Sequence, residues 1–331
     1  MQKRILTGDR PTGPLHLGHY VGTLSNRVKL QSEYEVFLIV ADLHTLTTKS
    51  SKEDIAKLPQ NIRSQVLDYL SVGIDPEKVT IYLQSQVPEV YELSLLFSML
   101  VTKERLERIP TLKDVMRDAG IEKPSLGLLG YPVLQAADIL MFNADLVPVG
   151  KDQESHIELS REIAKRFNSL YGQVFHEPQA LVGDVATLPG IDGSGKMSKS
   201  AGNAIYLTDD EETVRSKVMK TYTDPARIHA NDPGHIEGNV VFSYLDAFGK
   251  DKDEIETLKE RYKKGEVGDV EVKEKLVTVL NDFLAPIRAK RKEFEADPNL
   301  VDNILNKGTE RAREEASIVL KAAKEAMGLN Y

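Results

Sequence analysis

The chain has 331 residues, of which 41% are hydrophobic and 28% are charged, and this length predicts about two domains. Its 43 lysines and arginines against 51 aspartates and glutamates give a formal net charge of −8, which argues against a protein that coats duplex DNA. The absence of cysteine excludes disulfides, thiolate metal sites and cysteine nucleophiles.

Short β-rich runs alternate with helical patterns in the first half of the chain. Strands are predicted at 4–8, 35–44, 79–85 and 145–150, and helices at 17–30, 58–73, 87–101, 132–142 and 153–167. Near-continuous apolar runs such as 35–44 are typical of strands buried on both faces. The alternation therefore predicts an α/β fold, with a doubly wound, Rossmann-like parallel sheet that carries helices on both faces.

The pattern changes after residue 172. Residues 172–203 contain Gly, Pro and Ser and are weakly periodic, whereas helices are predicted at 209–221, 239–248, 252–264, 269–295 and 299–327. We therefore expect an α/β domain over 1–195, a mobile loop over 196–204 and a smaller all-helical domain over 205–296. The terminal helix 299–331 is expected to rejoin the first domain.

No targeting or membrane segment is predicted. The first ten residues carry charge without an apolar stretch, so we expect no signal peptide. The apolar segment 125–142 is interrupted by Pro132, Gln135 and Asp138, which argues against a membrane span. We expect a cytoplasmic protein.

The first candidate site is His16-Leu17-Gly18-His19, which lies between the first predicted strand and a predicted helix. Ligands of open α/β sheets bind at this edge, and a helix start presents free N–H groups that suit phosphate. Gly18 leaves room for a nucleotide against the backbone, and the histidines can donate hydrogen bonds to phosphate oxygens. The same pair would also suit a metal ion or a plain polar surface.

The second candidate site is Lys196-Met197-Ser198-Lys199-Ser200, in a loop rich in glycine and serine. Lysines on a mobile loop can close over a triphosphate and neutralise the departing pyrophosphate. A solvated linker and a P-loop are the other interpretations. The P-loop is disfavoured because Met197 stands where Ser or Thr would hold magnesium, and no clear strand precedes the segment.

Together the two motifs resemble those of class I aminoacyl-tRNA synthetases. Segments 127–140 and 144–168, the opening TGDRPTGPLHLGHYVG and the closing AMGLNY are similar to tryptophanyl-tRNA synthetases of the bacterial type. The resemblance extends over essentially the whole chain. It implies a tryptophan–tRNA ligase that forms tryptophanyl-adenylate from ATP and L-tryptophan and then charges tRNA(Trp).

The resemblance also implies the site residues. The catalytic residues are His16, His19, Lys196 and Lys199. The ATP contacts are Arg10, Pro11, Thr12, Gly18, His19, Gly150, Lys151, Asp152, Leu188, Lys196, Met197, Ser198, Lys199 and Ser200. The tryptophan contacts are Tyr131, Gln135, Asp138, Val147, Val149 and Gln153. The chain departs from many bacterial members at Arg10-Pro11-Thr12, Gln135 and Lys151, where those carry Gln-Pro-Ser, Met and Glu.

Partners follow from the same resemblance. ATP is expected with Mg²⁺ as a substrate complex, with no metal held by the protein itself, no membrane and no DNA. The helical domain would read the anticodon, for which the sequence offers a basic cluster at 288–292, although a solvated helix face is the alternative. The resemblance also implies a homodimer, and the leucine-rich stretch 93–100 fits either core or the surface of that dimer.

Asp138 lies in a predicted helix that is apolar on nearly every side. A buried carboxylate needs donors, which a backbone N–H, a serine or a substrate can supply. An indole N–H and a phenol O–H both fit, so a tyrosyl-tRNA synthetase, which shares the pattern at 131–138, stays open. Further alternatives are an idle RNA-binding or amino-acid-sensing paralogue and a small-molecule adenylyltransferase.

Overall fold

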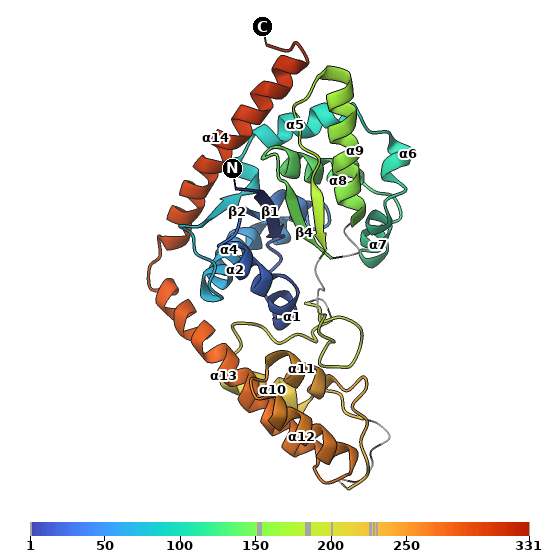
Figure 1. The fold of residues 1–331 in the computed structure, drawn as a ribbon, viewed down its shortest axis with the longest axis vertical. Helices are drawn as coiled ribbons and strands as arrows, with labels where there is room; N and C mark the ends of the chain where they lie inside the picture. The colour runs from blue at the N-terminus through green and yellow to red at the C-terminus, as the bar shows by residue number, and fades with distance from the viewer. Residues whose placement is uncertain are drawn as a thin grey trace.

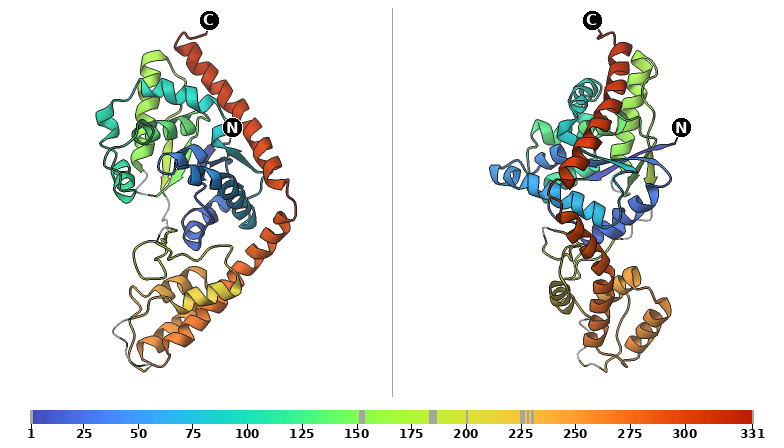
Figure 2. Two further views of the ribbon diagram at one scale, coloured as in Figure 1. Left: turned by 180° about the vertical axis from the view of Figure 1, so that it is seen from behind. Right: turned by 90° about the vertical axis from the view of Figure 1, so that its left-hand side faces the viewer.

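The computed structural model describes residues 2–150, 154–182, 187–199, 201–224, 227, 229 and 231–330. Figure 1 shows a sheet covered by helices and, at the opposite end of the molecule, a part built of helices. The long helix α14 (Leu300–Ala326) returns from the helical part and runs along the side of the sheet part, as the view from behind in Figure 2 also shows.

Five parallel strands form the sheet within the described residues. They are β1 (Arg4–Asp9), β2 (Glu35–Val40), β3 (Val79–Leu83), β4 (Leu146–Val149) and β5 (Gln179–Val182), in the spatial order β3-β2-β1-β4-β5. The strand order reverses at β1, so the switch point lies between the carboxyl ends of β1 and β4. Ligands of open α/β sheets bind at such a point. The predicted fold class is confirmed.

Alternate residues of β2 face two different cores. Val36 and Leu38 face one core together with α4 (Lys52–Ser71), whereas Phe37 faces another together with α8 (Leu126–Leu140) and α9 (Glu154–Tyr171). This alternation is the two-residue period of a strand that is buried on both faces.

Short helices and turns complete the sheet part. They are α1 (Leu17–His19), the π-helical turn η1 (Tyr20–Leu24), α2 (Ser25–Leu30), α3 (Asp42–Leu46), the 3-10 turn η2 (Gln84–Gln86), α5 (Glu89–Ser98), α6 (Lys103–Leu106) and α7 (Pro110–Asp118). In the part of the chain that the structure describes, no helix is both long enough and apolar enough to cross a membrane.

Helix α14 lies against the edge strand β3. A Cβ at Gly308 would overlap the carbonyl oxygen of Ile81, so glycine is needed for this close approach. The hydroxyl of Thr309 accepts a hydrogen bond from the N–H of Leu83 at 3.2 Å. The helix thus covers an edge that would otherwise be open to pairing with another strand.

The helical part contains α10 (Glu211–Met219), α11 (Val240–Phe248), α12 (Lys252–Lys263) and α13 (Asp269–Glu295). Helix α13 packs against α10 and α11 and also against α4 of the sheet part. One hydrophobic core continues from a face of the sheet into the helical part through Leu15, Leu17 and Ile205. The two parts therefore meet through buried side chains as well as through the covalent chain.

Two sequence predictions are wrong in the sheet part. The predicted strand 35–44 ends at Val40, and Asp42–Leu46 forms α3 instead, because His44 and its neighbours turn into the ligand edge of the sheet. Strand β5 lies within 172–203, which lacks the long apolar run of a central strand because β5 is an edge strand with partly exposed side chains.

Helix starts account for most of the remaining differences. Helices α4 and α8 begin earlier than predicted, since Ser51 and Ser125 cap them by accepting the N–H groups of Asp54 and Leu128 at 3.1 Å each. The short helices α6 and α7 were not predicted, because neither has an apolar face long enough to show a period.

Candidate active site

A buried ion pair fixes the end of β1. Arg27 donates to the carboxylate of Asp9, to the hydroxyl of Thr7 at 2.9 Å and to the carbonyl of Gly8 at 3.2 Å, and Tyr69 donates to Asp9 at 2.8 Å. Burial alone would raise the pKa of Asp9, but the charge of Arg27 outweighs it and holds that pKa well below its usual range. Asp9 is therefore a fixed negative charge at the switch point.

The two predicted histidines lie together at the start of α1. Their ring centroids are 3.8 Å apart, and the backbone N–H of His16 donates to Nδ1 of His19 at 3.2 Å. Nδ1 of His16 is buried and has no hydrogen-bond partner among the described residues. Burial, with the nearby positive charge of Lys199, lowers the pKa of His16 to about 3 and that of His19 to about 4. Both imidazoles are thus neutral at neutral pH, and each carries one N–H donor.

The packing around Gly18 also requires a residue without a side chain. A Cβ at this position would lie 2.9 Å from Nδ1 of His16 and 3.4 Å from Cβ of Met197. The missing side chain therefore leaves room for the His16 ring and the lysine loop, and the room expected for a nucleotide stays a prediction.

The residues around His16 pair with the chain that follows the lysine motif. Leu17 donates its N–H to Ile205 at 2.9 Å, Leu207 donates to Leu15 at 3.0 Å, and His16 and Tyr206 form an antiparallel bridge. The first motif is therefore held directly by the segment that connects the second motif to the helical part.

The lysine motif belongs to a small, internally bonded turn. The N–H of Met197 donates to the carbonyl of Leu188 at 3.0 Å, and the N–H of Ser198 donates to Oδ1 of Asn203 at 2.8 Å. The buried Asn203 also donates to Asp192 at 3.0 Å. Neither a P-loop nor a plain linker has this geometry, because the described residues of 187–203 form no strand–loop–helix unit and several of their backbone groups are paired.

The two lysines of the motif have different surroundings. Lys199 donates to the carbonyl of Gly13 at 2.7 Å and lies 3.3 Å from the hydroxyl of Thr12, beside the histidines. Burial lowers the pKa of Lys199 to about 8, while the charges of Asp9 and Asp68 oppose this, so the ammonium group is still mostly charged at neutral pH. The side chain of Lys196 is exposed.

A cleft of about 890 Å³ opens beside Asp9 between the ends of β1 and β4. Its lining includes the predicted residues Arg10, Tyr131, Gln135, Asp138, Val147, Val149 and Gly150. Residues of α7 lie along the cleft too, with Thr111, Asp114, Val115 and Asp118. The cleft has the size of a small-molecule site and combines apolar walls with a few polar groups.

Asp138 is only 2% exposed and faces this cleft from α8. Gln84, in the turn after β3, donates to both carboxylate oxygens at 3.0 and 2.9 Å, and Nε2 of His44 lies 2.8 Å from Oδ2. Burial raises the pKa of Asp138 against the effect of these donors. A carboxylate has about four lone-pair sites, so capacity remains for one further donor.

A second buried histidine orients the hydroxyl group of Tyr131. Nε2 of His156 lies 3.0 Å from that hydroxyl and 2.8 Å from the hydroxyl of Thr111. The three side chains come from α8, α9 and α7, and His156 and Tyr131 line the cleft. The arrangement holds a polar group at a defined place on an otherwise apolar wall.

The structure thus gathers the predicted residues into two neighbouring groups. One group lines the cleft. The other group contains His16, Gly18, His19, Thr12, Met197 and Lys199. The buried Pro11 precedes Thr12 in the chain, and the carbonyl of Leu188 accepts the N–H of Met197. Lys151, Asp152, Gln153 and Ser200 lie outside the described residues.

Three polar residues of the site were missed, namely His44, Gln84 and His156. His44 lies in α3, just beyond the end of β2, and Gln84 directly follows β3. The carboxyl edge of the sheet collects such residues, so the ends of these two strands are the signal that identifies both. His156 carries no such signal, because one histidine on an amphipathic helix is most often an ordinary buried residue.

Comparisons with known proteins match this geometry. A family model described as "tRNA synthetases class I (W and Y)" matches residues 2–285. The chain belongs to this family of class I aminoacyl-tRNA synthetases. It is 58% identical over 327 residues to the tryptophan–tRNA ligase of Treponema pallidum, covering 99% of this chain and 97% of that protein. It is 55% identical over 331 residues to the ligase of the same name from Borreliella burgdorferi, covering 99% and 94%.

A solved structure agrees with the sequence relatives. The tryptophanyl-tRNA synthetase of Campylobacter jejuni, complexed with ADP and tryptophan, superposes with a TM-score of 0.88 at 36% identity and covers 98% of this synthetase and 100% of that chain. The family membership inferred from the two motifs is confirmed.

The basic cluster predicted for RNA is only partly available in this synthetase. Arg291 is bound to Asp68, and Arg288 donates to the backbone carbonyl of Asp209 at 3.1 Å. Lys290 and Lys292 are exposed. Two members of the predicted cluster, Arg288 and Arg291, therefore make contacts within the protein.

Proposed function

We propose that this synthetase activates L-tryptophan with ATP, forming tryptophanyl-adenylate, and then transfers tryptophan to tRNA(Trp). The observation that carries the proposal is that the Asp138 cleft and the His16–His19–Lys199 cluster occupy the same edge of the sheet. The relatives named tryptophan–tRNA ligases, at 58% and 55% identity over nearly the whole chain, favour tryptophan over tyrosine.

Activation is the attack of the tryptophan carboxylate on the α-phosphorus of ATP, with pyrophosphate leaving. The carboxylate is ionised at neutral pH, so this step needs no general base. The neutral His16 and His19 donate N–H groups to phosphate oxygens, and Lys199 supplies positive charge next to them. Magnesium arrives with ATP as part of the substrate. Catalysis then consists of positioning and charge stabilisation.

Selection of the amino acid falls to the cleft. The indole N–H donates to the open site on Asp138, while Val147 and Val149 form the apolar walls. The Tyr131 hydroxyl, oriented by His156, meets the polar end of tryptophan. A phenylalanine side chain would leave the Asp138 carboxylate without that donor, which gives strong rejection without editing.

Transfer to tRNA completes the reaction. In the class I pattern the acyl group passes to the 2′-hydroxyl of the terminal ribose, and the helical domain over 205–296 reads the anticodon. The exposed Lys290 and Lys292 are the members of the basic cluster that remain free for RNA. Residues 1–195 with the terminal helix 299–331 form the catalytic unit, and residues 196–204 form the loop that closes on ATP.

One assay tests the proposal: ATP–pyrophosphate exchange with each amino acid in turn. We expect exchange with tryptophan alone. Exchange with tyrosine instead would favour the tyrosyl alternative, and no exchange with any amino acid would favour an idle paralogue or a different adenylyltransferase.

Asp138→Asn tests the selecting carboxylate in the same assay. A hydrogen bond to a charged group contributes about 1.5–3 kcal/mol, so the KM for tryptophan should rise roughly 10- to 100-fold. The variant keeps the size and shape of the side chain and so controls for packing. An unchanged KM would remove Asp138 from tryptophan recognition.

A further inference from the structure

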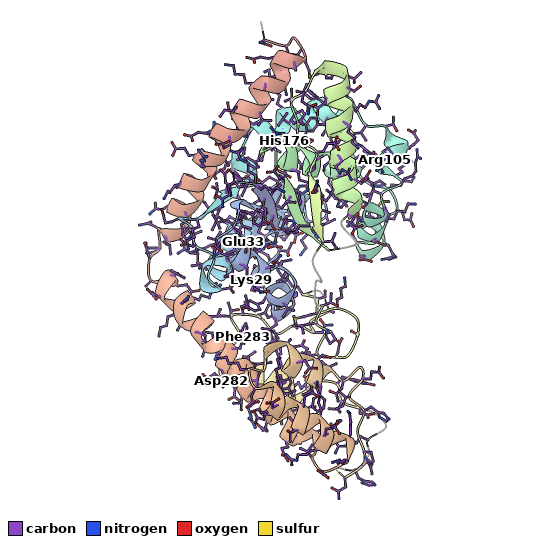
Figure 3. The ribbon with its side chains drawn as sticks, viewed as in Figure 1. Lys29, Glu33, Arg105, His176, Asp282 and Phe283 are labelled. Carbon is purple, nitrogen blue, oxygen red and sulfur yellow. The ribbon has the colours of Figure 1, made fainter. Side chains whose placement is uncertain are left out.

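Helix α13 of the helical part reaches the segment that carries the two histidines at three places. We call residues Leu15–Tyr20 the histidine segment. The first contact is aromatic: the ring of Phe283 lies edge-on to the ring of Tyr20, with centroids 4.8 Å apart. Figure 3 labels Phe283 where α13 approaches the sheet part. Tyr20 directly follows His19, so this contact lies one residue from a candidate catalytic side chain.

The second contact runs through Asp209. Arg288 of α13 donates to the backbone carbonyl of Asp209 at 3.1 Å, and the carboxylate of Asp209 accepts the N–H of Tyr206 at 2.8 Å. Tyr206 is the residue that forms the antiparallel bridge with His16. A displacement of α13 would therefore reach His16 through Arg288, Asp209 and Tyr206.

The third contact runs through a buried carboxylate. Asp68 of α4 is 0% exposed, and its two carboxylate oxygens serve different parts of the molecule. Oδ2 accepts the N–H of Leu15 at 2.9 Å, and Oδ1 binds Arg291 of α13. Arg291 also donates to the backbone carbonyl of Ser64 at 3.2 Å. One carboxylate thus joins the residue before His16 to the helical part.

Stability alone does not explain an ion pair at this place. Burying a carboxylate and a guanidinium is costly, and a pair of apolar side chains of similar volume is often as stable or more stable. Helix α13 already packs against α4 and shares its core, with Leu284 and Ile287 buried nearby. The distinctive property of Asp68 is its simultaneous hold on Leu15 and Arg291.

We propose that Arg291 and Asp68 are positioning residues for adenylate formation, because they fix the position of the histidine segment relative to the helical part. The inference rests on the proposed function, because it concerns the same activation step. A synthetase built in this way would adjust the position of its catalytic imidazoles when its RNA-reading part moves. The effect requires no contact between Arg291 and either substrate.

Arg291→Gln tests the proposal in the full-length enzyme. The kcat of tryptophan-dependent ATP–pyrophosphate exchange should fall by at least about tenfold, with the KM for tryptophan within about twofold, because an interaction felt only in the transition state is lost. Arg291→Lys keeps the charge opposite Asp68 and should restore most of the rate. Arg215→Gln, which breaks the exposed ion pair with Glu274 inside the helical part, is the matched control and should leave kcat unchanged.

A double-mutant cycle with Asp68→Asn shows whether the two residues act as a unit. The asparagine can still accept the N–H of Leu15 but no longer pairs with Arg291. Each single variant should lower kcat, and the double variant should be no slower than the slower single variant. Losses that multiply, or an unchanged kcat in Arg291→Gln, would overturn the proposal.

Amide hydrogen exchange provides a readout that does not depend on activity. Peptides that cover residues 12–24 should exchange faster in Arg291→Gln than in the wild type, while those from β3 should not. Unchanged exchange in the histidine segment contradicts the inference even if the enzyme is active. A wild-type protein without tryptophan-dependent exchange contradicts the proposed function instead, so the two failures are distinguishable.

Discussion

At the scale of single residues, the site depends on side chains that are buried but not fully bonded. His16 is buried, and its Nδ1 has no hydrogen-bond partner among the described residues. A buried polar atom without a partner costs free energy, and native proteins rarely keep one without a role. We infer that ATP supplies the missing contact, since a phosphate oxygen can accept from a neutral imidazole.

The titration of the two histidines gives a prediction at this scale. Because burial lowers the pKa of His16 to about 3 and that of His19 to about 4, the ring-proton NMR signals of both should stay unchanged between pH 5 and pH 8 in the free enzyme. Assignment by His16→Gln and His19→Gln identifies the two signals.

The same shifts predict how stability depends on pH. The folded-state pKa values of both histidines lie below the ordinary value, so between about pH 4 and 6.5 the unfolded chain binds more protons, and their contribution to stability is lost as the pH falls. Asp68, whose pKa burial raises to about 6 against the charge of Arg291, contributes with the opposite sign between about pH 4 and 6. The difference in the midpoint of unfolding between the wild type and His16→Gln isolates the contribution of His16. If this difference were the same at pH 7 and at pH 5, the lowered pKa of His16 would be contradicted.

At the scale of structural elements, the lysine motif is a folded turn organised by Asn203. This residue is 3% exposed and bonds to Ser198 and Asp192, while its backbone carbonyl accepts the N–H of Ile191 at 3.0 Å. The same turn places the ammonium group of Lys199 against the carbonyl of Gly13. The shape of the turn, and not only its composition, therefore decides where the ammonium group lies.

Asn203→Ala should consequently slow adenylate formation without changing tryptophan binding. It removes the hydrogen bonds from the Ser198 N–H and to Asp192, at a cost of about 1–3 kcal/mol to the local fold. Gly190→Ala provides an independent approach to the same turn, because a Cβ there would overlap Nδ2 of Asn203. Pyrophosphate exchange and equilibrium tryptophan binding measure the two effects separately. Equal losses of exchange rate and of tryptophan affinity would show that the shape of the cleft depends on the turn, which would contradict this prediction.

At the scale of the whole molecule, an exposed apolar surface lies on α5. Of the predicted leucine-rich stretch, Leu93 and Phe97 are buried, whereas Leu95 is 59% exposed and Met99 is 71% exposed. The core interpretation is thus confirmed for Leu93 and Phe97, whereas the homodimer surface stays a prediction. Exposed apolar side chains on α5 and directly after it are what such a surface requires.

We expect the wild type to sediment as a homodimer and a double variant, Leu95→Glu with Met99→Glu, to sediment as a monomer. Placing two carboxylates at a closely packed apolar interface leaves buried, unpaired charges. Val270→Glu, at an equally exposed apolar position in the helical part, is the control and should leave the mass unchanged. A wild-type monomer, or a dimer that survives both charges, would contradict the assignment.

The sequence by itself determined the class of fold, the family and the reaction. Alternating apolar runs predict a parallel sheet because the periods of strands and helices are local properties, and the two motifs are short, contiguous and specific. The two motifs, with the resemblance of segments 127–140 and 144–168 to tryptophanyl-tRNA synthetases, were therefore enough to indicate which chemistry the protein carries out.

The tertiary structure decided which residues act together. Asp138 meets Gln84 and His44 across three elements, and Asp68 meets Leu15 and Arg291 across the boundary between the two parts. Such partners are far apart in the chain, and a charged residue on a helix looks the same in sequence whether it faces solvent or a buried carboxylate. Contact depends on how elements pack, and packing is a property of the whole fold that no local pattern records.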